Sequence, residues 1–478
     1  MAKASGLLIG GKWLEDGDRL VVRDKYDGEP VSEVAVASPD HVAHAVDVAA
    51  AAVAHGPLDP RQRSAVLSRA AQNLAAARAR VVEDYVAETG FTLADAETEL
   101  ERTMETLTLC AAEALRLSGE VVPVSAAPGA GDRICFTMRV PVGVVGAIAP
   151  FNAPLNTVAH KIGPAIAAGN AVVLKPAAST PLSSIHLCEA LLDAGLPGEY
   201  LGLVVGPGST TGQSLVEDRR VRYFTFTGST QVGLLVKQRS GIAKTHLELG
   251  GNCATIVCED ADLASAADLI VRGGYRKAGQ VCTSVQRLLV VAAVADELEE
   301  MLAERVKALQ VGDPHQQGTQ VGPMISSGER ARAARMVDQA LRSGARRVAG
   351  GDGSGSVLEP TLLADVPEDS EIMSEEIFAP VVAMRGVPDF AAAIELANAT
   401  RYGLQAGIFT KDIDRALWAA EHLDVGGVMV NDTSSYHADL MPYGGRRDSG
   451  YGLEGPRYAV QDMTDARTVV VRRRLSAQ

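Results

Sequence analysis

Three residues of this 478-residue chain combine reactive side chains with surroundings that suit catalysis. Cys282, in GGYRKAGQVCTS, follows Gly279-Gln280 and precedes two small residues, so its thiol could be exposed at a turn and act as a nucleophile. Glu248 ends an apolar strand in KTHLELGGN, where burial would raise its pKa toward neutrality and suit it to act as a base. Asn152, in APFNAPLN, follows a strand, and its side-chain amide could donate to a developing oxyanion.

Each of these residues also has a purely structural interpretation. A free cysteine is usually a small hydrophobic core residue, a glutamate at a strand end can be exposed, and Asn-x-Pro segments are common turn formers. The remaining cysteines lie in amphipathic or apolar runs, and we expect them to be packing residues: Cys110, Cys135, Cys188, Cys253 and Cys258.

Two glycine-containing segments could bind a phosphate. FTGST (226–230) follows a strand and opens a helix, so that backbone N–H groups near Gly228 and Ser229 could hold an anion. GPGSTTG (206–212), which includes Gly208, follows the preceding strand in the same way. An ordinary glycine turn is the alternative for both, and no GxGxxG follows the first strand.

The elements around these residues indicate an α/β protein. A helix starts at Ser38-Pro39-Asp40 and stops at Gly56-Pro57, and further helical patterns cover about 61–79 and 93–118. From about residue 140, short β-branched runs alternate with helices, beginning with VGVVGAIA (142–149) and AVVLK (171–175). This βαβ rhythm predicts a mostly parallel sheet with helices on both faces.

A second α/β block follows KTHLELGGN, which predicts two domains joined near residue 250. Its strands are CATIVC (253–258), VQRLLVV (285–291) and LQAGIFT (404–410). The segments RICFTMRVP (133–141) and TVVVRRRL (468–475) resemble strands outside this rhythm. Exposed edges of that kind invite pairing with another subunit.

Composition narrows the function classes. Asp and Glu number 59 against 45 Lys and Arg, a net charge of −14 that disfavours nucleic acid and anionic membranes as partners. The longest apolar runs are shorter than the roughly 18 residues that a membrane span needs. Six cysteines without a CxxC pair, and no signal-peptide pattern, predict a reducing cytoplasm. We expect no metal site.

Seven short motifs, taken together, resemble the conserved segments of one known enzyme family, although none of them is specific alone. From about residue 7 to 475 the chain resembles the aldehyde dehydrogenase superfamily, through PFNAPLN, KPAASTP, FTGST, LELGGN, GQVC, EEIFAP and PYGGRRDSG. The resemblance implies an α/β fold with two Rossmann-type parallel-sheet domains and a small β oligomerisation extension. It places the cofactor-binding domain at 1–118 and 140–249, the catalytic domain at 250–456, and the bridging strands at 119–139 and 457–478.

The resemblance also implies an NAD(P)-dependent oxidation of an aldehyde to its acid. Cys282 would attack the aldehyde, Asn152 would stabilise the thiohemiacetal oxyanion, hydride would pass to the nicotinamide, and Glu248 would activate the water that hydrolyses the thioester. The presence of Glu248 favours hydrolysis over transfer to coenzyme A. Glu454 and Lys161 match residues of a proton relay.

For the cofactor, the resemblance assigns Lys175 to the adenosine ribose, Ser229 to the pyrophosphate, Glu376 to the nicotinamide ribose and Phe378 to the side of the ring. NAD-selective relatives often carry a glutamate three positions after that lysine, where this chain has Ala178. Without that negative charge, NADP should be tolerated or preferred over NAD.

The expected substrate pocket contains Arg102, Phe151, Val281 and His437. Relatives that oxidise phosphorylated aldehydes place basic residues where this chain has Val281, Ala153 and His437, so a dianionic substrate is disfavoured. Arg102 and His437 are possible carboxylate partners, with a solvated helix face and an ordinary loop histidine as the alternatives. We therefore expect a small neutral, hydroxylated or apolar aldehyde first and a semialdehyde such as succinate semialdehyde second.

The resemblance further implies a homodimer or homotetramer. One alternative of another class is a catalytically silent structural or binding protein on the same fold. Such a protein would be expected to have lost Cys282, Glu248 or Asn152, and all three are present. An acylating dehydrogenase that requires coenzyme A is the alternative within enzymology.

Overall fold

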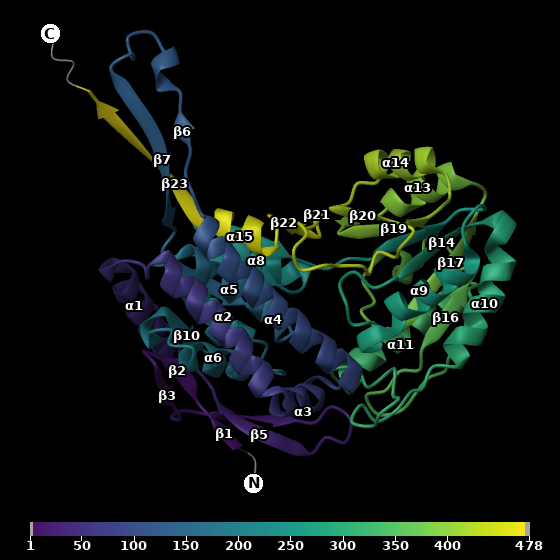
Figure 1. Cartoon of the computed structure of the whole chain (residues 1–478). Coiled ribbons are helices and arrows are strands. Elements are labelled where there is room, and N and C mark those ends of the chain that lie inside the picture. The colour runs from purple at the N-terminus through teal and green to yellow at the C-terminus, as the bar shows by residue number, and fades with distance from the viewer. Residues whose placement is uncertain (1–2, 474–478) are drawn as a thin grey trace.

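The computed structural model describes residues 3–473, and its main body consists of two α/β units around two separate sheets (Figure 1). The first sheet has the strand order β22-β12-β11-β8-β9-β10-β2-β3. The strands are β2 (Leu7–Ile9), β3 (Lys12–Leu14), β8 (Val144–Ile148), β9 (Ala171–Lys175), β10 (Leu201–Leu203), β11 (Val221–Thr227), β12 (Lys244–Glu248) and β22 (Gly450–Tyr451). The central five run parallel, whereas β22, β2 and β3 are antiparallel to their neighbours. The expected parallel sheet therefore has antiparallel edges.

Helices cover both faces of this first sheet. The helices are α1 (Pro39–His55), α2 (Pro60–Ala76), α3 (Arg78–Thr89), α4 (Leu93–Arg116), α5 (Asn156–Ala168), α6 (Leu182–Asp193), α7 (Gln213–Glu217), α8 (Thr230–Arg239) and α15 (Pro456–Asp462). Helices α2 and α4 pack on α5 and α6 as an outer layer. The chain passes from β8 outward to β10 and then returns to β11 on the other side of β8, which creates a switch point between β8 and β11.

The helical pattern predicted through residue 79 is divided in the structure. Helix α2 ends at Ala76, and α3 starts at Arg78 after a break at Ala77 (φ −91°, ψ 7°). Neither glycine nor proline marks this break, so the sequence carried no signal for it. The start of α1 agrees with its prediction, because the Ser38 side chain accepts from His41 N and Pro39 begins the helix.

The second sheet has the order β15-β16-β17-β14-β13-β19-β20, parallel except for β15. Its strands are β13 (Ala254–Val257), β14 (Arg287–Val291), β15 (Arg346–Ala349), β16 (Thr361–Ala364), β17 (Val381–Val387), β19 (Gln405–Phe409) and β20 (Gly427–Val430). Its helices are α9 (Leu263–Tyr275), α10 (Ala295–Lys307), α11 (Ser327–Arg342), α12 (Glu371–Ser374), α13 (Phe390–Asn398) and α14 (Ile413–His422). Strand β22 comes from this later part of the chain but pairs with β12 of the first sheet.

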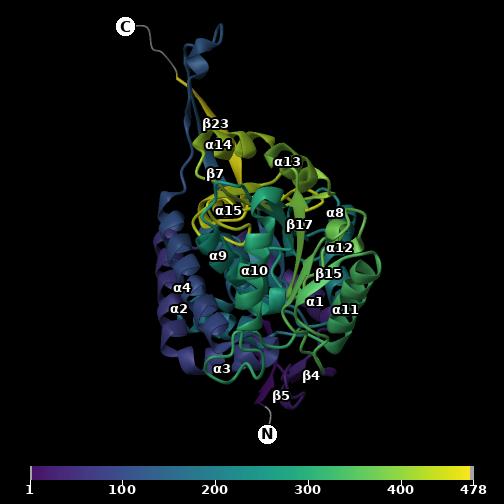
Figure 2. The ribbon, with the colours of Figure 1, turned by 90° about the vertical axis from the view of Figure 1, so that its right-hand side faces the viewer.

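A third, smaller sheet projects from the body (Figures 1 and 2). It is formed by β6 (Val121–Val122), β7 (Arg133–Pro141) and β23 (Thr464–Arg472), all antiparallel. Both predicted outlying strands are present in it, although residues 474–475 of the second prediction lie outside the described residues. Two small sheets complete the fold. One has three strands, β1 (Lys3–Ser5), β5 (Pro30–Ala35) and β4 (Arg19–Arg23), and the other pairs β18 (Tyr402–Gly403) with β21 (Arg446–Arg447).

The core is built from small aliphatic side chains at close approach. Strands β8 and β9 are buried at every residue. Gly146 of β8 faces the Phe224 ring, where a β-carbon would lie 2.7 Å from the ring, and Gly163 of α5 packs on Cys110 of α4. Within residues 3–473, no helix is long and apolar enough to cross a membrane, and no cluster of three or more His, Cys, Asp or Glu side chains could hold a metal ion.

Candidate active site

The three candidate residues meet where the carboxyl edge of the first sheet faces the amino edge of the second. Asn152 follows β8, Glu248 ends β12, and Cys282 lies in a turn shortly before β14. Asn152 Nδ2 donates to Gln280 O over 2.9 Å, which joins the loop after β8 to the cysteine loop. Carboxyl ends of parallel strands at a switch point are the usual place for a ligand site in an open α/β sheet.

An unusual backbone turn presents Cys282. Lys277, Ala278 and Gly279, in the helical turn η4 (Arg276–Gly279), all have positive φ of 51°, 51° and 67°. A β-carbon on Gly279 would lie 2.0 Å from Ala379 O, so this position requires glycine. The turn leaves Cys282 half-buried, whereas the other five cysteines are buried, and all six are free thiols.

The Cys282 thiol contacts Tyr443, a residue that the sequence did not single out. Tyr443 Oη lies 3.0 Å from Cys282 Sγ. Burial raises the pKa of the Cys282 thiol to about 12, and the hydrogen bond from Tyr443 acts in the opposite direction. A hydroxyl donor at the sulfur favours the thiolate, so Tyr443 makes the Cys282 thiol more acidic than burial alone would. Its place in PYGG was the only signal that could have found it.

Glu248 is a buried carboxyl with one oxygen held and one free. Its Oε1 lies 2.8 Å from His246 Nε2, and Oε2 has no hydrogen-bond partner among the described residues. Burial raises the pKa of Glu248 to about 7, although the His246 hydrogen bond lowers it. A carboxyl with this pKa can accept a proton from water near neutral pH. The sequence did not identify His246, which is two residues earlier and on the same face of β12.

Glu454 and Lys161 form a buried pair beside Glu248. Lys161 Nζ lies 3.3 Å from Glu454 Oε1 and also donates to Thr227 Oγ1 over 2.6 Å. Burial alone would raise the pKa of Glu454, but attraction to Lys161 and nearby histidines holds it at about 2. Glu454 is therefore ionised while Glu248 titrates near neutrality, and its charge contributes to the raised pKa of Glu248.

Lys175, at the carboxyl end of β9, is the strongest candidate to bind a cofactor. Its ammonium is buried and donates to Pro176 O over 3.0 Å, and no carboxylate of residues 3–473 forms an ion pair with it. Burial lowers the pKa of Lys175 to about 8. Gly212 approaches its side chain so closely that a β-carbon would lie 3.4 Å from Lys175 Cε. A buried cation without a counter-charge suits the hydroxyl groups or phosphate of a nucleotide ribose.

The other expected cofactor residues surround the same edge of the sheet. Gly208 opens a turn, η3 (Gly208–Gly212), after β10, and Ser229 caps the N-terminus of α8. Gly228 precedes Ser229, and its N–H donates to Glu248 O over 3.0 Å. Ala178 is half-buried. These positions leave backbone N–H groups at a helix start, which suits a pyrophosphate.

Glu376 and Phe378 line a pocket on the side of the second sheet, beside the cysteine loop. Glu376 Oε1 accepts from Gly251 N over 3.0 Å, and burial raises its pKa to about 7. Phe378 has a φ of 51° and packs edge-to-face on Phe151 with ring centroids 5.8 Å apart. A pocket of about 200 Å³ is lined by Gly251, Glu376, Phe378 and Val281, next to Cys282. The residues expected at the nicotinamide end are thus beside the nucleophile.

Arg102 contacts His437, His437 packs on Tyr443, and Tyr443 contacts Cys282. Arg102 binds Asp439 through two hydrogen bonds of 3.0 and 2.7 Å, and its Nη2 lies 2.6 Å from His437 Nδ1. The His437 ring packs edge-to-face on Tyr443 at 4.7 Å. Burial and the Arg102 charge lower the pKa of His437 to about 3, so it is a neutral acceptor. Arg102 is therefore not a residue of a solvated helix face.

Arg276 is a second guanidinium at this end of the site, and the sequence did not identify it. It donates to Ser435 Oγ over 3.2 Å and to Ser435 O over 3.4 Å, and no carboxylate of the described chain pairs with it. Burial lowers the pKa of Arg276, the carboxylate of Asp95 opposes this shift, and the Arg102 charge adds to it. Arg276 therefore places positive charge near the cysteine, whereas the charge of Arg102 is balanced by Asp439.

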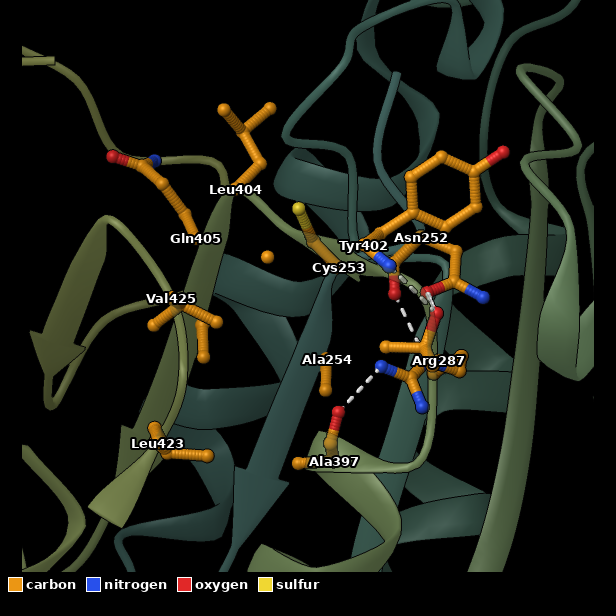
Figure 3. A pocket seen from close by; sticks show the side chains of 13 residues that line it. Asn252, Cys253, Ala254, Arg287, Ala397, Tyr402, Leu404, Gln405, Leu423 and Val425 are labelled. Carbon is orange, nitrogen blue, oxygen red and sulfur yellow. Dashed lines mark hydrogen bonds between the residues drawn. The ribbon is translucent and has the colours of Figure 1, made fainter. Parts of the chain in front are cut away.

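A separate pocket of about 260 Å³ lies behind the cysteine loop (Figure 3). Cys253 lines it and donates to Cys282 O over 3.5 Å. Arg287 also lines it, but its guanidinium donates to three main-chain carbonyls: Asn252 O, Leu396 O and Ala397 O. With its donors engaged in this way, Arg287 serves the packing of α13 against the sheet and is not available to an anion.

A half-buried cysteine, the Asn152 amide, a buried carboxyl and backbone N–H groups at the start of a helix are the groups expected of an oxidoreductase that works through a cysteine. The aldehyde dehydrogenase family model matches residues 13–469. The chain is 43% identical, over 98% of both chains, to a 3-sulfolactaldehyde dehydrogenase from Priestia megaterium. It therefore belongs to the aldehyde dehydrogenase family and is an NAD(P)-dependent oxidoreductase that acts on aldehydes, as its resemblance implied.

Two solved structures are similar over nearly the whole chain. Aldehyde dehydrogenase 21 from Physcomitrella patens, in complex with the reaction product succinate, has a TM-score of 0.96 with 36% identity and covers 99% of each chain. The NADP-dependent glyceraldehyde-3-phosphate dehydrogenase from Bacillus halodurans C-125, in complex with NADP, has a TM-score of 0.96 with 36% identity, covering 99% of this chain and 100% of the other. The fold prediction is confirmed.

Proposed function

We propose that the chain oxidises a short aldehyde that carries an anionic group, and that the product is the free carboxylic acid. The observation that carries the substrate class is Arg276, a half-buried guanidinium that forms no ion pair among residues 3–473 and lies on the same side of the cysteine loop as Arg102. The carboxylates of Asp95 and Glu99 attract it without forming an ion pair with it, so its guanidinium can still bind the anionic group of a ligand.

The proposed reaction begins at Cys282. The thiolate attacks the aldehyde carbon, and the carbonyl oxygen becomes an oxyanion that accepts from the Asn152 amide and from the Cys282 N–H. The Cys282 N–H has no acceptor among the described residues and is free for this role. NAD(P), when bound, supplies the hydride acceptor, so that the former aldehyde carbon ends as a thioester on Cys282.

Hydrolysis of the thioester is assigned to Glu248. Its free Oε2 accepts a proton from water, the water oxygen attacks the thioester carbon, and the Cys282 thiolate leaves with the sulfur–carbon electron pair. The pKa of about 7 supports this role, because the carboxylate form is populated at neutral pH. Glu454, which is paired with Lys161, lies beside Glu248 and is proposed to receive the proton from it.

The anionic group is proposed to be a single carboxylate or sulfonate. The similarity to enzymes described with 3-sulfolactaldehyde and with succinate supports this class. Val281 and Ala153 add no further positive charge, which favours a monoanion over a phosphate. Of the two substrate classes expected from the sequence, these observations favour the semialdehyde type over the neutral aldehydes.

NADP is proposed to be tolerated or preferred over NAD. Lys175 without a carboxylate partner and Ala178 in place of a glutamate leave room and charge for a 2′-phosphate. Gly208, Gly228 and Ser229 would hold the pyrophosphate, and Glu376 and Phe378 the nicotinamide ribose and ring. The NADP complex of the similar Bacillus halodurans enzyme supports this preference.

We infer that residues 1–118 and 140–249 form the cofactor-binding part, that 250–456 form the catalytic part, and that the projecting sheet joins subunits of a homodimer or homotetramer. The exposed apolar side chains of that sheet support a partner of the same kind. Six free thiols, one of them the nucleophile, support a reducing cytoplasm.

A kinetic panel tests the substrate class. Succinate semialdehyde and butanal have the same number of carbons and differ by the carboxylate, and each is measured with NAD and with NADP by absorbance at 340 nm. We expect kcat/KM to be at least about tenfold higher for succinate semialdehyde, and Arg276→Met to remove most of that ratio. Equal values for the two aldehydes in the wild-type enzyme would contradict the anionic class, and a requirement for coenzyme A would contradict hydrolysis.

A further inference from the structure

Lys277 occupies a backbone conformation that suits few side chains. Lys277 (φ 51°, ψ 34°) and Ala278 (φ 51°, ψ 39°) are consecutive left-handed residues, where glycine or asparagine would be less strained. Such a strained conformation persists only where surrounding contacts stabilise it, and it is found most often at functional sites. The question is therefore what the lysine side chain does at this position.

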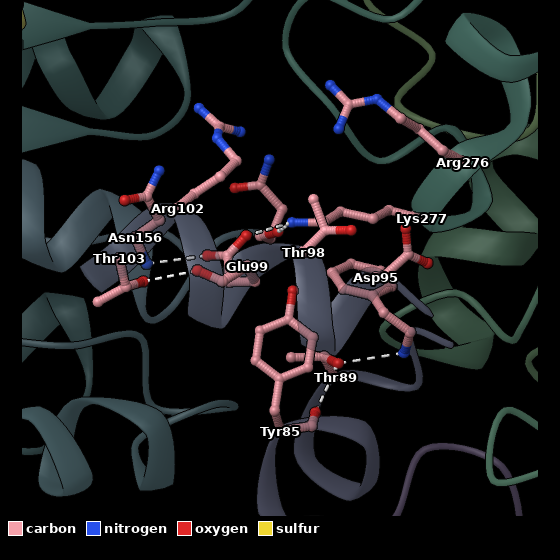
Figure 4. Close-up of polar contacts among 12 residues, drawn as sticks. Tyr85, Thr89, Asp95, Thr98, Glu99, Arg102, Thr103, Asn156, Arg276 and Lys277 are labelled. Atoms are coloured by element: carbon pink, nitrogen blue, oxygen red, sulfur yellow. Dashed lines mark hydrogen bonds and ion pairs between the residues drawn. The ribbon is translucent and has the colours of Figure 1, made fainter. Parts of the chain in front are cut away.

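The Lys277 ammonium is buried and joins three parts of the chain. Its Nζ donates to Glu99 Oε2 of α4 over 2.7 Å and to the backbone oxygen of Asn152 over 3.0 Å. The rings of Phe91 and Tyr85 lie 5.4 and 5.9 Å from it and cover its remaining side. Figure 4 shows Lys277 extending from the cysteine loop to Glu99, between α4 and the loops. None of these partners is on its own element.

Glu99 also binds the far end of the loop that begins at Asn152. Its second oxygen, Oε1, accepts from Asn156 N over 2.9 Å, at the first residue of α5 (Figure 4). The loop from Asn152 to Asn156 is thus held at both ends by one buried ion pair, once through a carbonyl and once through an N–H. Both oxygens of Glu99 and two of the three ammonium protons have partners, as a buried pair requires.

The same contacts also fix the loop relative to Cys282. The Asn152 amide donates to Gln280 O, and the Gln280 side chain donates to Lys277 O over 3.3 Å and accepts from Ile325 N over 2.9 Å. Asn152 is consequently bound to the cysteine loop through its side chain and, by way of Lys277, through its main chain. These two hydrogen bonds, one at its side chain and one at its main chain, fix the orientation of the Asn152 amide.

We propose that Lys277 is a positioning residue that, with Glu99, holds the Asn152 amide in register with Cys282. This inference rests on the proposed role of Asn152 as the oxyanion donor. A donor displaced by a fraction of an ångström stabilises the transition state much less, while the aldehyde still binds. Lys277 therefore acts on the rate of acylation at saturating aldehyde and has little effect on KM.

The experiment is a double-mutant cycle on single-turnover kinetics. Wild type, Lys277→Met, Asn152→Ala and the double variant are mixed with excess succinate semialdehyde and NADP, and the NADPH burst rate is measured by stopped flow. We expect K277M to lower the burst rate by about tenfold to a hundredfold while KM changes by less than about threefold. In the N152A background, K277M should lower it by less than about twofold, because the group it positions is gone.

Controls separate positioning from loss of fold. Removing one partner of a buried ion pair destabilises a protein, so K277M is paired with K277M/E99Q, which leaves two neutral side chains and should recover the melting temperature without recovering the burst. Arg63→Met is the matched control, since Arg63 is a buried cation on α2 against Gly169. R63M should lower the melting temperature while the burst rate stays within about twofold of wild type.

Each contrary result points to a different failure. Equal losses from K277M in both backgrounds, or recovery of the burst by K277M/E99Q, would overturn the positioning role. An unchanged burst in N152A would instead contradict the proposed function of Asn152.

Discussion

Burial favours the protonated thiol of Cys282, whereas the Tyr443 hydroxyl favours the thiolate. Burial raises its pKa to about 12, and Tyr443 at 3.0 Å lowers it. The acidity of the Cys282 thiol therefore depends on a residue 161 positions away in the chain. Neighbouring charges also act on it, because the Glu248 and Glu454 carboxylates disfavour a thiolate.

Replacing Tyr443 by phenylalanine should make the thiol less acidic. Loss of a hydrogen bond to a charged group, worth about 1.5–3 kcal/mol, corresponds to an upward pKa shift of about one to two units. Alkylation of Cys282 by iodoacetamide at pH 9, followed by peptide mass spectrometry, should slow by about tenfold or more. Tyr402→Phe is the control, because Tyr402 bonds Glu375 and not the thiol. Equal alkylation rates in wild type and Y443F would contradict the assignment.

The Glu248–His246 contact predicts a pH dependence with a defined sign. The carboxylate of Glu248 is the active form, so thioester hydrolysis should rise as pH increases through about 7. His246 lowers that pKa through its hydrogen bond, so His246→Leu should move the midpoint to higher pH. His246→Gln, which retains a donor, should move it less. The steady-state kcat profile from pH 5 to 9 measures both, and a downward shift in H246L would refute this account of the base.

At the scale of elements, turns and strand ends position the chemistry. Glu248 and Lys175 end parallel strands of the first sheet, and the η4 turn of the second unit brings Cys282 near Glu248. Strand β22 crosses between the units and pairs with β12 at Glu248. The base is thus held between a parallel and an antiparallel neighbour.

Gly279→Ala tests the turn that presents the nucleophile. The new β-carbon would lie 2.0 Å from Ala379 O at a φ of 67°, so we expect a loss of about 2 kcal/mol or more in the free energy of unfolding. Gly129→Ala is the control, because Gly129 has a φ of 75° and nothing within 4 Å, and it should lose about 1 kcal/mol. Urea denaturation followed by circular dichroism measures both. Equal losses would mean that the close approach to Ala379 is unimportant.

The sequence predicted what its local patterns encode and missed what only tertiary contacts create. The βαβ rhythm, the cap at Ser38 and the motifs around Cys282, Glu248 and Asn152 are local, and they led to the right fold and family. The partners of these residues are not local: Tyr443 is distant in sequence from Cys282, Arg276 bonds Ser435, and Lys277 bonds α4 and the loop after β8. The start of α3 was missed because Ala77 gives no turn signal.

At the scale of the whole molecule, the projecting sheet is the feature that the chain's own core does not explain. It extends from the first unit (Figure 1), and its β7 and β23 strands expose large apolar side chains. Ile134 and Val471 face each other across the two strands, with 45% and 46% of their surfaces exposed. An apolar pair of that kind on a projecting sheet suits contact with a second copy.

Charges at this pair should disrupt the assembly. Light scattering after size exclusion should give the mass of a dimer or tetramer for the wild type and a lower mass for Ile134→Glu/Val471→Glu, because two buried carboxylates would oppose the interface. Ile413→Glu is the control, since Ile413 is exposed on α14 in the second unit. A wild-type monomer, or an unchanged mass in the double variant, would contradict the proposed oligomerisation role.

Intact-protein mass spectrometry of Glu248→Gln separates oxidation of the aldehyde on Cys282 from release of the acid by Glu248. With NADP and succinate semialdehyde, E248Q should form about one equivalent of NADPH and then stop, carrying one acyl group that peptide mapping assigns to Cys282. Continued turnover without an adduct, or an adduct on one of the five buried cysteines, would contradict the account.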